Sequence, residues 1–209
     1  MKMIGTQIFD NSSPRLLTRP NHSLIVCWAE RAALLVLTAY FCVHTMPRAW
    51  KSLVTDFPNY YLAAQLVHQG FDTSRMYEWQ WFEREKDHRA IPIRVIGLVP
   101  ITPFSTLFIW PLTALKPLAA KRVWIMLSLT LLVPISWALR PMTGLSYQRI
   151  ALLFALSFPL YRNIEFGQFY VVLLLLIATA CWACMRERPA LAGALLAIAA
   201  MSKIFPVLF

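Results

Sequence analysis

The stretch VWIMLSLTLLVPISWAL, residues 123–139, contains no charged side chain and is nearly long enough to cross the hydrocarbon core of a bilayer. Short, charged connections separate it from similar apolar segments. This alternation predicts several membrane helices, because an α-helix satisfies its own backbone hydrogen bonds inside lipid. We expect five or six, with the short segment 150–161 tilted, partly buried or re-entrant. The other apolar segments are residues 24–46, 98–115, 150–161, 169–185 and 190–209.

The composition excludes a soluble domain of this size. Hydrophobic residues make up 58% of the chain, and only 14% of residues are charged. The net charge is +10, but the basic residues are scattered between apolar runs and do not form one stripe. Anionic membrane lipid is therefore the expected partner, and nucleic acid is not.

These patterns predict an all-α fold, a multi-span transmembrane helical bundle. We expect a polar cytoplasmic tail over residues 1–23 and a transmembrane domain over residues 24–209. The domain includes one long loop, residues 47–95, which holds six of the ten acidic residues. This loop is the expected place for chemistry.

Two helices are expected within the loop. Apolar residues recur at helical spacing up to Gly70, which predicts a helix with one apolar face lying along the membrane surface. A second surface helix is predicted to start near Ser74. The run from Glu83 to Asp87, with Lys86 inside it, is typical of a solvated helix face.

The charges flanking the apolar segments predict an orientation. Lys116, Lys121 and Arg122 mark one cytoplasmic turn, which places the long loop on the external face. Strict alternation of the segments then puts Arg186 and Arg188 outside as well, against the preference of basic residues for the cytoplasmic side. Either segment 150–161 does not cross or the preference fails here.

Several short motifs follow one another in a particular order. They are TDFPNYYLAA at 55–64, PF at 103–104, PL at 111–112, EFGQ at 165–168 and KIFP at 203–206. Together these motifs resemble glycosyltransferase family 87. The resemblance implies a GT-C fold with juxtamembrane helices in its first external loop, and a polyprenol-phosphate-mannose-dependent mannosyltransferase.

The resemblance runs from about Asp56 to the end and corresponds to the first half of a family-length chain. The last apolar run stops at Phe209 without a polar flank, so we expect the chain to be part of a larger protein. Two stretches depart from the family pattern. ITPF stands at 101–104 in place of YPPF, and FY at 169–170 occupies the region where the family has an Asn.

Transfer from a lipid-phosphate sugar requires one base, because the phosphate leaving group needs no proton. In GT-C enzymes the base is a carboxylate that lies just after the first span. The resemblance assigns this role to Asp56. The alternative is that Asp56 caps a helix beginning near Pro58, since Asp is favoured at helix N-termini. Both roles can coexist.

Four other residues are candidates for substrate binding. Arg94, at the end of the loop, can hold the leaving phosphate or simply anchor the next helix. Lys203 lies inside an apolar run, where an unpaired charge is costly, so it is either partnered or functional. Gln168 can bond a sugar hydroxyl or cap a helix end, and Tyr60 lies on the aromatic helix behind Asp56.

The predicted function is therefore transfer of a hexose, mannose, from a polyprenyl-phosphate donor to a lipid or glycan acceptor, in the cell membrane. No cofactor is implied, and no residues have metal-ligand spacing; His68 and His88 are lone loop histidines. The alternative is a transporter or a non-catalytic multi-pass membrane protein. A transporter typically shows an internal repeat, which this sequence lacks.

Overall fold

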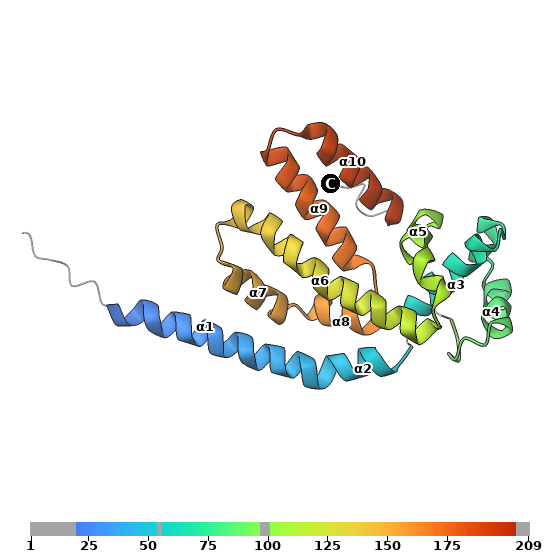
Figure 1. Cartoon of the computed structure of the whole chain (residues 1–209), viewed down its shortest axis with the longest axis horizontal. Coiled ribbons are helices and arrows are strands. Elements are labelled where there is room, and N and C mark those ends of the chain that lie inside the picture. The colour runs from blue at the N-terminus through green and yellow to red at the C-terminus, as the bar shows by residue number, and fades with distance from the viewer. Residues whose placement is uncertain (1–19, 54–55, 97–100, 204–209) are drawn as a thin grey trace, which may run out of the picture.

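The computed structural model of the chain describes residues 20–53, 56–96 and 101–203 (Figure 1). These residues form helices, and no strand occurs among them, so the predicted all-α class is confirmed. Most of the predicted tail, residues 1–23, lies outside the described ranges. The α-helices are α1 Pro20–Tyr40, α2 Met46–Lys51, α3 Asp56–His68, α4 Trp79–His88, α5 Thr106–Ile109, α6 Pro117–Thr143, α7 Tyr147–Leu156, α8 Phe158–Phe166, α9 Tyr170–Met185 and α10 Pro189–Ser202.

Two helical runs are long and apolar enough to cross a bilayer: α6 and the run that begins with α1. A π-helical turn, Phe41–Thr45, joins α1 to α2. Many exposed positions of α1 carry large apolar side chains. Such exposure is unfavourable in water and favourable in lipid. These side chains include Leu24, Ile25, Trp28, Leu35 and Val36. The helices α9 and α10 are apolar but shorter.

The predicted spanning helix over residues 98–115 is wrong for the part that the structure describes. Short pieces replace it: a 3-10 turn at Pro103–Ser105, then α5, then a second 3-10 turn at Trp110–Ala114. Pro103 and Pro111 each stand at the start of a turn, because proline lacks the N–H that a continuing helix needs. The pieces pack against α3.

The predicted short segment 150–161 is also divided. The helices α7 and α8 meet at Ser157, whose hydroxyl accepts a hydrogen bond from the Leu160 N–H at 3.3 Å. Ser157 thus caps α8, and Pro159 occupies its first turn. Neither helix alone has the length of a span, and the two together lead from the far end of α6 back toward α3 (Figure 1).

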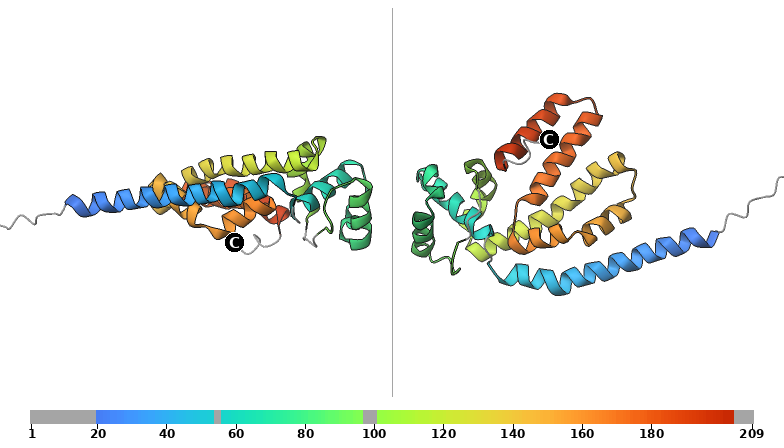
Figure 2. Two further views of the ribbon diagram at one scale, coloured as in Figure 1. Left: turned by 90° about the horizontal axis from the view of Figure 1, so that it is seen from below. Right: turned by 180° about the vertical axis from the view of Figure 1, so that it is seen from behind.

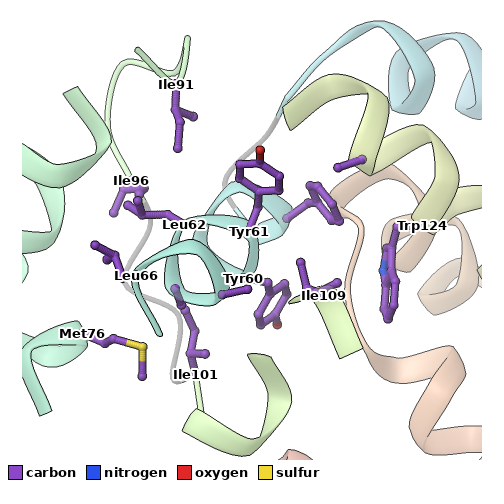
Figure 3. Packing of buried hydrophobic residues seen from close by; sticks show 14 of the residues in the cluster. Tyr60, Tyr61, Leu62, Leu66, Met76, Ile91, Ile96, Ile101, Ile109 and Trp124 are labelled. Carbon is purple, nitrogen blue, oxygen red and sulfur yellow. The ribbon is translucent and has the colours of Figure 1, made fainter. Parts of the chain in front are cut away.

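The loop 47–95 is helical, as predicted, but α3 is not a surface helix with a single apolar face. Residues 57–64 of α3 are buried on every side, and the largest hydrophobic cluster of the described residues surrounds them (Figure 3). Leu62 and Leu66 point one way, whereas Ile109 and Trp124 of α5 and α6 lie on the other side. The predicted apolar positions within residues 57–64 are buried, but residues between them, Asn59 and Leu62 among them, are buried too.

The expectation that residues 83–87 form a solvated face is wrong for Lys86, of which only 3% is exposed. Its ammonium donates to Glu83 at 2.6 Å and to the carbonyls of Ile93 and Arg94 at 3.1 Å each. Glu83 in turn accepts the N–H of Ile96 at 2.9 Å. This pair fixes the chain after α4, because segment 91–96 has few other hydrogen-bond partners.

The expectation that Lys121 and Arg122 lie on the opposite side of the membrane from the long loop is wrong, because both lie at the same end of the bundle as that loop. Lys121 donates to the carbonyl of Ser52 at 2.7 Å, and Arg122 donates to that of Trp50 at 3.1 Å. The expectation failed because the chain from 101 to 116 folds back on α3 instead of crossing. Arg140 and Arg186 share the opposite end (Figure 1).

The helix α4 runs across the long direction of α1 in both views (Figures 1 and 2). If α1 follows the membrane normal, α4 lies in the membrane plane, as the loop prediction requires. The helices α1, α6 and α9 instead extend away from the loop, so the loop covers one end of the bundle.

Candidate functional site

Asp56 lies in the first turn of α3 and is partly exposed. Its Oδ2 accepts a hydrogen bond from Nε2 of Gln168, which is 112 positions further along the chain. Two of the predicted site residues, a candidate base and a candidate sugar contact, are therefore in direct contact. The amide fixes one side of the carboxylate, and the first turn of a helix favours a negative charge.

Gln168 reaches Asp56 because α8 ends on Gly167. The N–H groups of Gly167 and Gln168 both bond to the carbonyl of Asn163, and Gly167 has a φ of +68°, which glycine adopts without strain. A Cβ on Gly167 would lie only 2.8 Å from the Cβ of Phe57, the residue after Asp56. Glycine is thus required twice, for the turn and for this close approach.

We expect Gly167→Ala to lower the free energy of unfolding more than Gly144→Ala does. Gly144 has nearly the same φ, +69°, but open space around it. Both changes place a Cβ on a left-handed backbone, which lowers the free energy of unfolding by about 1–2 kcal/mol. Only the change at Gly167 also displaces Phe57, which lowers it by about 1–3 kcal/mol more. Thermal unfolding of the purified variants in detergent measures the difference; equal losses would contradict the tight approach.

Lys121 connects the two chain segments from the other side. Its buried ammonium, 0% exposed, bonds to the carbonyls of Ser52 at 2.7 Å and Glu165 at 2.8 Å. One segment leads into Asp56, and the other leads into Gln168. Sequence reasoning missed this role because a basic residue at the start of an apolar run is typical of a membrane-flanking anchor.

Tyr60 packs beside the cluster and is only 3% exposed (Figure 3). Its ring meets that of Phe169 edge to face, with centroids 4.5 Å apart. Burial raises the pKa of the Tyr60 phenol well above its ordinary value, and the charges of Asp56 and Tyr170 raise it further. The phenol therefore stays protonated and can act as a hydrogen-bond donor beside the carboxylate.

Lys203 joins the same region through Tyr170. Its Nζ donates to the Tyr170 hydroxyl at 3.0 Å and lies 4.1 Å from the centroid of that ring. Asn163 accepts the backbone N–H of Tyr170 at 3.0 Å, which places the start of α9 beside the α8 turn. The expectation that Lys203 is partnered is met by an aromatic hydroxyl and not by an acid.

The model of glycosyltransferase family 87 matches residues 102–209, more than half of the chain. The chain belongs to glycosyltransferase family 87. No curated protein and no solved structure matches it. Membership makes this chain a membrane glycosyltransferase, and the resemblance to the family is confirmed. The match begins after the long loop, so it includes Gln168 and Lys203 but not Asp56, Tyr60 or Arg94.

Within this family 87 chain, Arg94 stands apart from the other predicted site residues. Its side chain is exposed and makes no hydrogen bond or ion pair with any residue that the structure describes. Only its carbonyl is used, as an acceptor for Lys86. The remaining four candidates meet where α3 and α9 begin and where α8 and α10 end.

One of the two departures from the family 87 pattern, FY at 169–170, lies in this region. Tyr170 holds Lys203, and Phe169 packs between Tyr60 and the ring of Trp124, whose centroid is 4.9 Å away. In the described part of the chain, no three His, Cys, Asp or Glu side chains gather closely enough to hold a metal ion. The chemistry to be explained is therefore that of one carboxylate, an amide, two phenols and an ammonium.

Proposed function

We propose that the chain transfers a hexose, mannose, from a polyprenyl-phosphate donor to a lipid or glycan acceptor, with Asp56 as the general base. The observation that supports this best is the contact between Asp56 and Gln168. It joins the loop carboxylate to the EFGQ turn, which lies in the part of the chain that matches the family.

The reaction balances with a single carboxylate. Asp56 takes the proton of the acceptor hydroxyl as its oxygen attacks the anomeric carbon. The bond from that carbon to the phosphate oxygen breaks, and polyprenyl phosphate leaves with the electron pair. Hydrolysis of an ordinary glycoside would need a second carboxyl group to protonate the departing oxygen. Attack from the face opposite the phosphate inverts the anomeric configuration.

Gln168 positions the base in this proposal. An amide N–H on one carboxylate oxygen fixes that oxygen and orients the group, so that the other oxygen can face the acceptor. Tyr60, protonated and packed nearby, supplies a further donor for a sugar hydroxyl or for the carboxylate itself.

Lys203 is the cation that we assign to the leaving phosphate. Its Nζ is held on Tyr170, at the start of α9, and an ammonium placed there stabilises the negative charge that develops on the phosphate. Arg94 is the second candidate, from the end of the loop. The Arg94 side chain is long and exposed, but no contact within the described residues fixes its orientation.

We place the loop 47–95 and the site on the external face of the cell membrane. The opposite end of the bundle carries basic residues in its short connections or in the helix ends beside them, namely Arg140, Arg149, Arg186 and Arg188. Basic residues in short connections favour the cytoplasmic side. With residues 101–116 not crossing, α1, α6, α7 with α8, α9 and α10 give five passages, and the earlier conflict over Arg186 disappears.

The donor class can be tested with the chain in native membranes, an extract of lipid and glycan acceptors, and labelled sugars. We expect transfer from polyprenyl-phosphate mannose and little or none from a mannose nucleotide. The reason is that the site offers one carboxylate and one cation but no metal cluster in its described part for a diphosphate. Transfer from the nucleotide without any polyprenyl phosphate would contradict the proposal.

The same assay distinguishes the two candidate cations. Lys203→Gln should raise the KM for the donor about tenfold or more, since one charge-assisted contact to phosphate is lost. Arg94→Gln is the matched comparison. A larger rise for Arg94 than for Lys203 would move the phosphate to the end of the loop.

A further inference from the structure

A pocket lies at the end of the bundle opposite Asp56, between the end of α6, the start of α7 and the end of α9. Its volume is about 400 Å³. Along α6, Arg140 lies about 28 Å from Lys121, at about 1.5 Å per residue. This separation matches the hydrocarbon thickness of a bilayer, about 30 Å. The lining residues are Trp137, Arg140, Pro141, Gly144, Tyr147, Trp182 and Arg186.

Both arginines of this pocket stack on aromatic rings. The Arg140 guanidinium carbon lies 4.6 Å from the centroid of Tyr147, and that of Arg186 lies 5.6 Å from that of Trp182. Trp137 and Trp182 are themselves in contact, with centroids 5.4 Å apart. Stacking holds a guanidinium by its face and leaves the N–H groups on its edge available.

The pocket has no negative charge of its own. No acidic residue lines it, and neither arginine forms an ion pair with another residue in the described ranges. Arg149, at the same end, differs because it pairs with Glu30 at 2.9 Å. Two guanidinium groups that share one concave site without a counter-charge favour an anionic ligand with several acceptor oxygens.

We propose that this pocket binds the phosphate headgroup of an anionic phospholipid. Tryptophan and tyrosine favour the headgroup level of a bilayer, where both an apolar ring and a polar edge are satisfied. The exposed apolar side chains of Val133 and Trp137 continue from the pocket along α6, where acyl chains can lie. A free phosphate ion would use the arginines but gain nothing from this apolar flank.

The bound lipid links three helices that meet at this end. Arg140 and Tyr147 come from α6 and α7, whereas Trp182 and Arg186 come from α9. The ligand therefore stabilises the far end of the bundle and takes no part in sugar transfer. Its site is separated from Asp56 by about the length of α6 (Figure 1).

Thermal unfolding of the purified chain in detergent, with added lipid, tests the assignment. We expect phosphatidylglycerol to raise the Tm in a saturable way, and phosphatidylcholine and inorganic phosphate to have little effect at the same concentration. Equal stabilisation by phosphatidylcholine would overturn an anion site. Equal stabilisation by inorganic phosphate would assign a soluble anion and overturn the lipid.

Variants connect the effect to this pocket. Arg140→Gln with Arg186→Gln should weaken phosphatidylglycerol binding about tenfold or more, because charge-assisted hydrogen bonds are lost. Arg149→Gln is the matched control at the same end and should leave the affinity unchanged. Arg140→Lys with Arg186→Lys should bind phosphatidylglycerol more tightly than the double Gln variant does, because both positive charges are kept. Native mass spectrometry counts the retained lipid independently of stability, and unchanged lipid retention by the double Gln variant would overturn the proposal.

Discussion

We expect Asp56→Asn to abolish sugar transfer in a chain that still folds and inserts into the membrane. Asn keeps the size of the side chain and an oxygen that can accept the Gln168 amide, and it caps a helix about as well as Asp does. Only the basicity is lost. Removal of a general base typically lowers the rate about a hundred- to ten-thousand-fold, far more than the loss of a helix cap worth about 1 kcal/mol.

The measurement is the initial rate of transfer in membranes with equal amounts of each variant. Asp72→Asn is the matched control, because Asp72 caps the 3-10 turn Thr73–Tyr77 through the Ser74 N–H at 2.9 Å and lies in the same loop. It should keep nearly normal turnover. Near-normal turnover by the Asp56 variant would show that this carboxylate is structural and that the base lies elsewhere.

Lys121→Met is expected to have the largest effect on stability. The replacement has a similar length, but it leaves the carbonyls of Ser52 and Glu165 without their buried partner. An unsatisfied buried group costs about 1–3 kcal/mol, so with two such carbonyls we expect the free energy of unfolding to fall by about 2–6 kcal/mol. Transfer should fall as well, because these bonds hold the segments that carry Asp56 and Gln168.

Unfolding in detergent, followed by circular dichroism, gives the first quantity, and the transfer assay gives the second. Lys116→Met is the control, because Lys116 is an exposed lysine at the N-cap of the same helix. An exposed substitution of this kind changes stability by no more than about 0.5 kcal/mol. If the Lys121 and Lys116 variants unfold alike, the two carbonyl contacts do not stabilise the site.

Much of the site could be proposed from the chain alone, because motifs record local chemistry. Asp56 follows the first apolar run, and Gln168 ends the EFGQ turn; in the structure the two side chains are hydrogen-bonded to each other. Lys203 was recognisable because a charge inside an apolar run needs a partner. Arg94 was chosen on position in the loop, and position along a chain does not say where a long side chain lies.

The residues between the motifs were harder to interpret. Hydropathy predicted a span over 98–115, but the described part of it breaks at Pro103 and Pro111 and packs on α3. Average apolarity cannot distinguish a segment that crosses lipid from one that is buried in protein, because both environments exclude water. The same ambiguity made α3 look like a surface helix.

The amino-acid sequence alone determined the helical class, the membrane character and the residue types available for catalysis, since these depend on composition and local periodicity. The tertiary structure decided which ends of the helices meet. Lys121 connects two segments only because the carbonyls of Ser52 and Glu165, 69 and 44 positions away in the sequence, both accept its hydrogen bonds. Gly167 became a contact point only because Phe57 packs on it. Contacts between distant segments depend on how the whole bundle packs, which no local pattern contains.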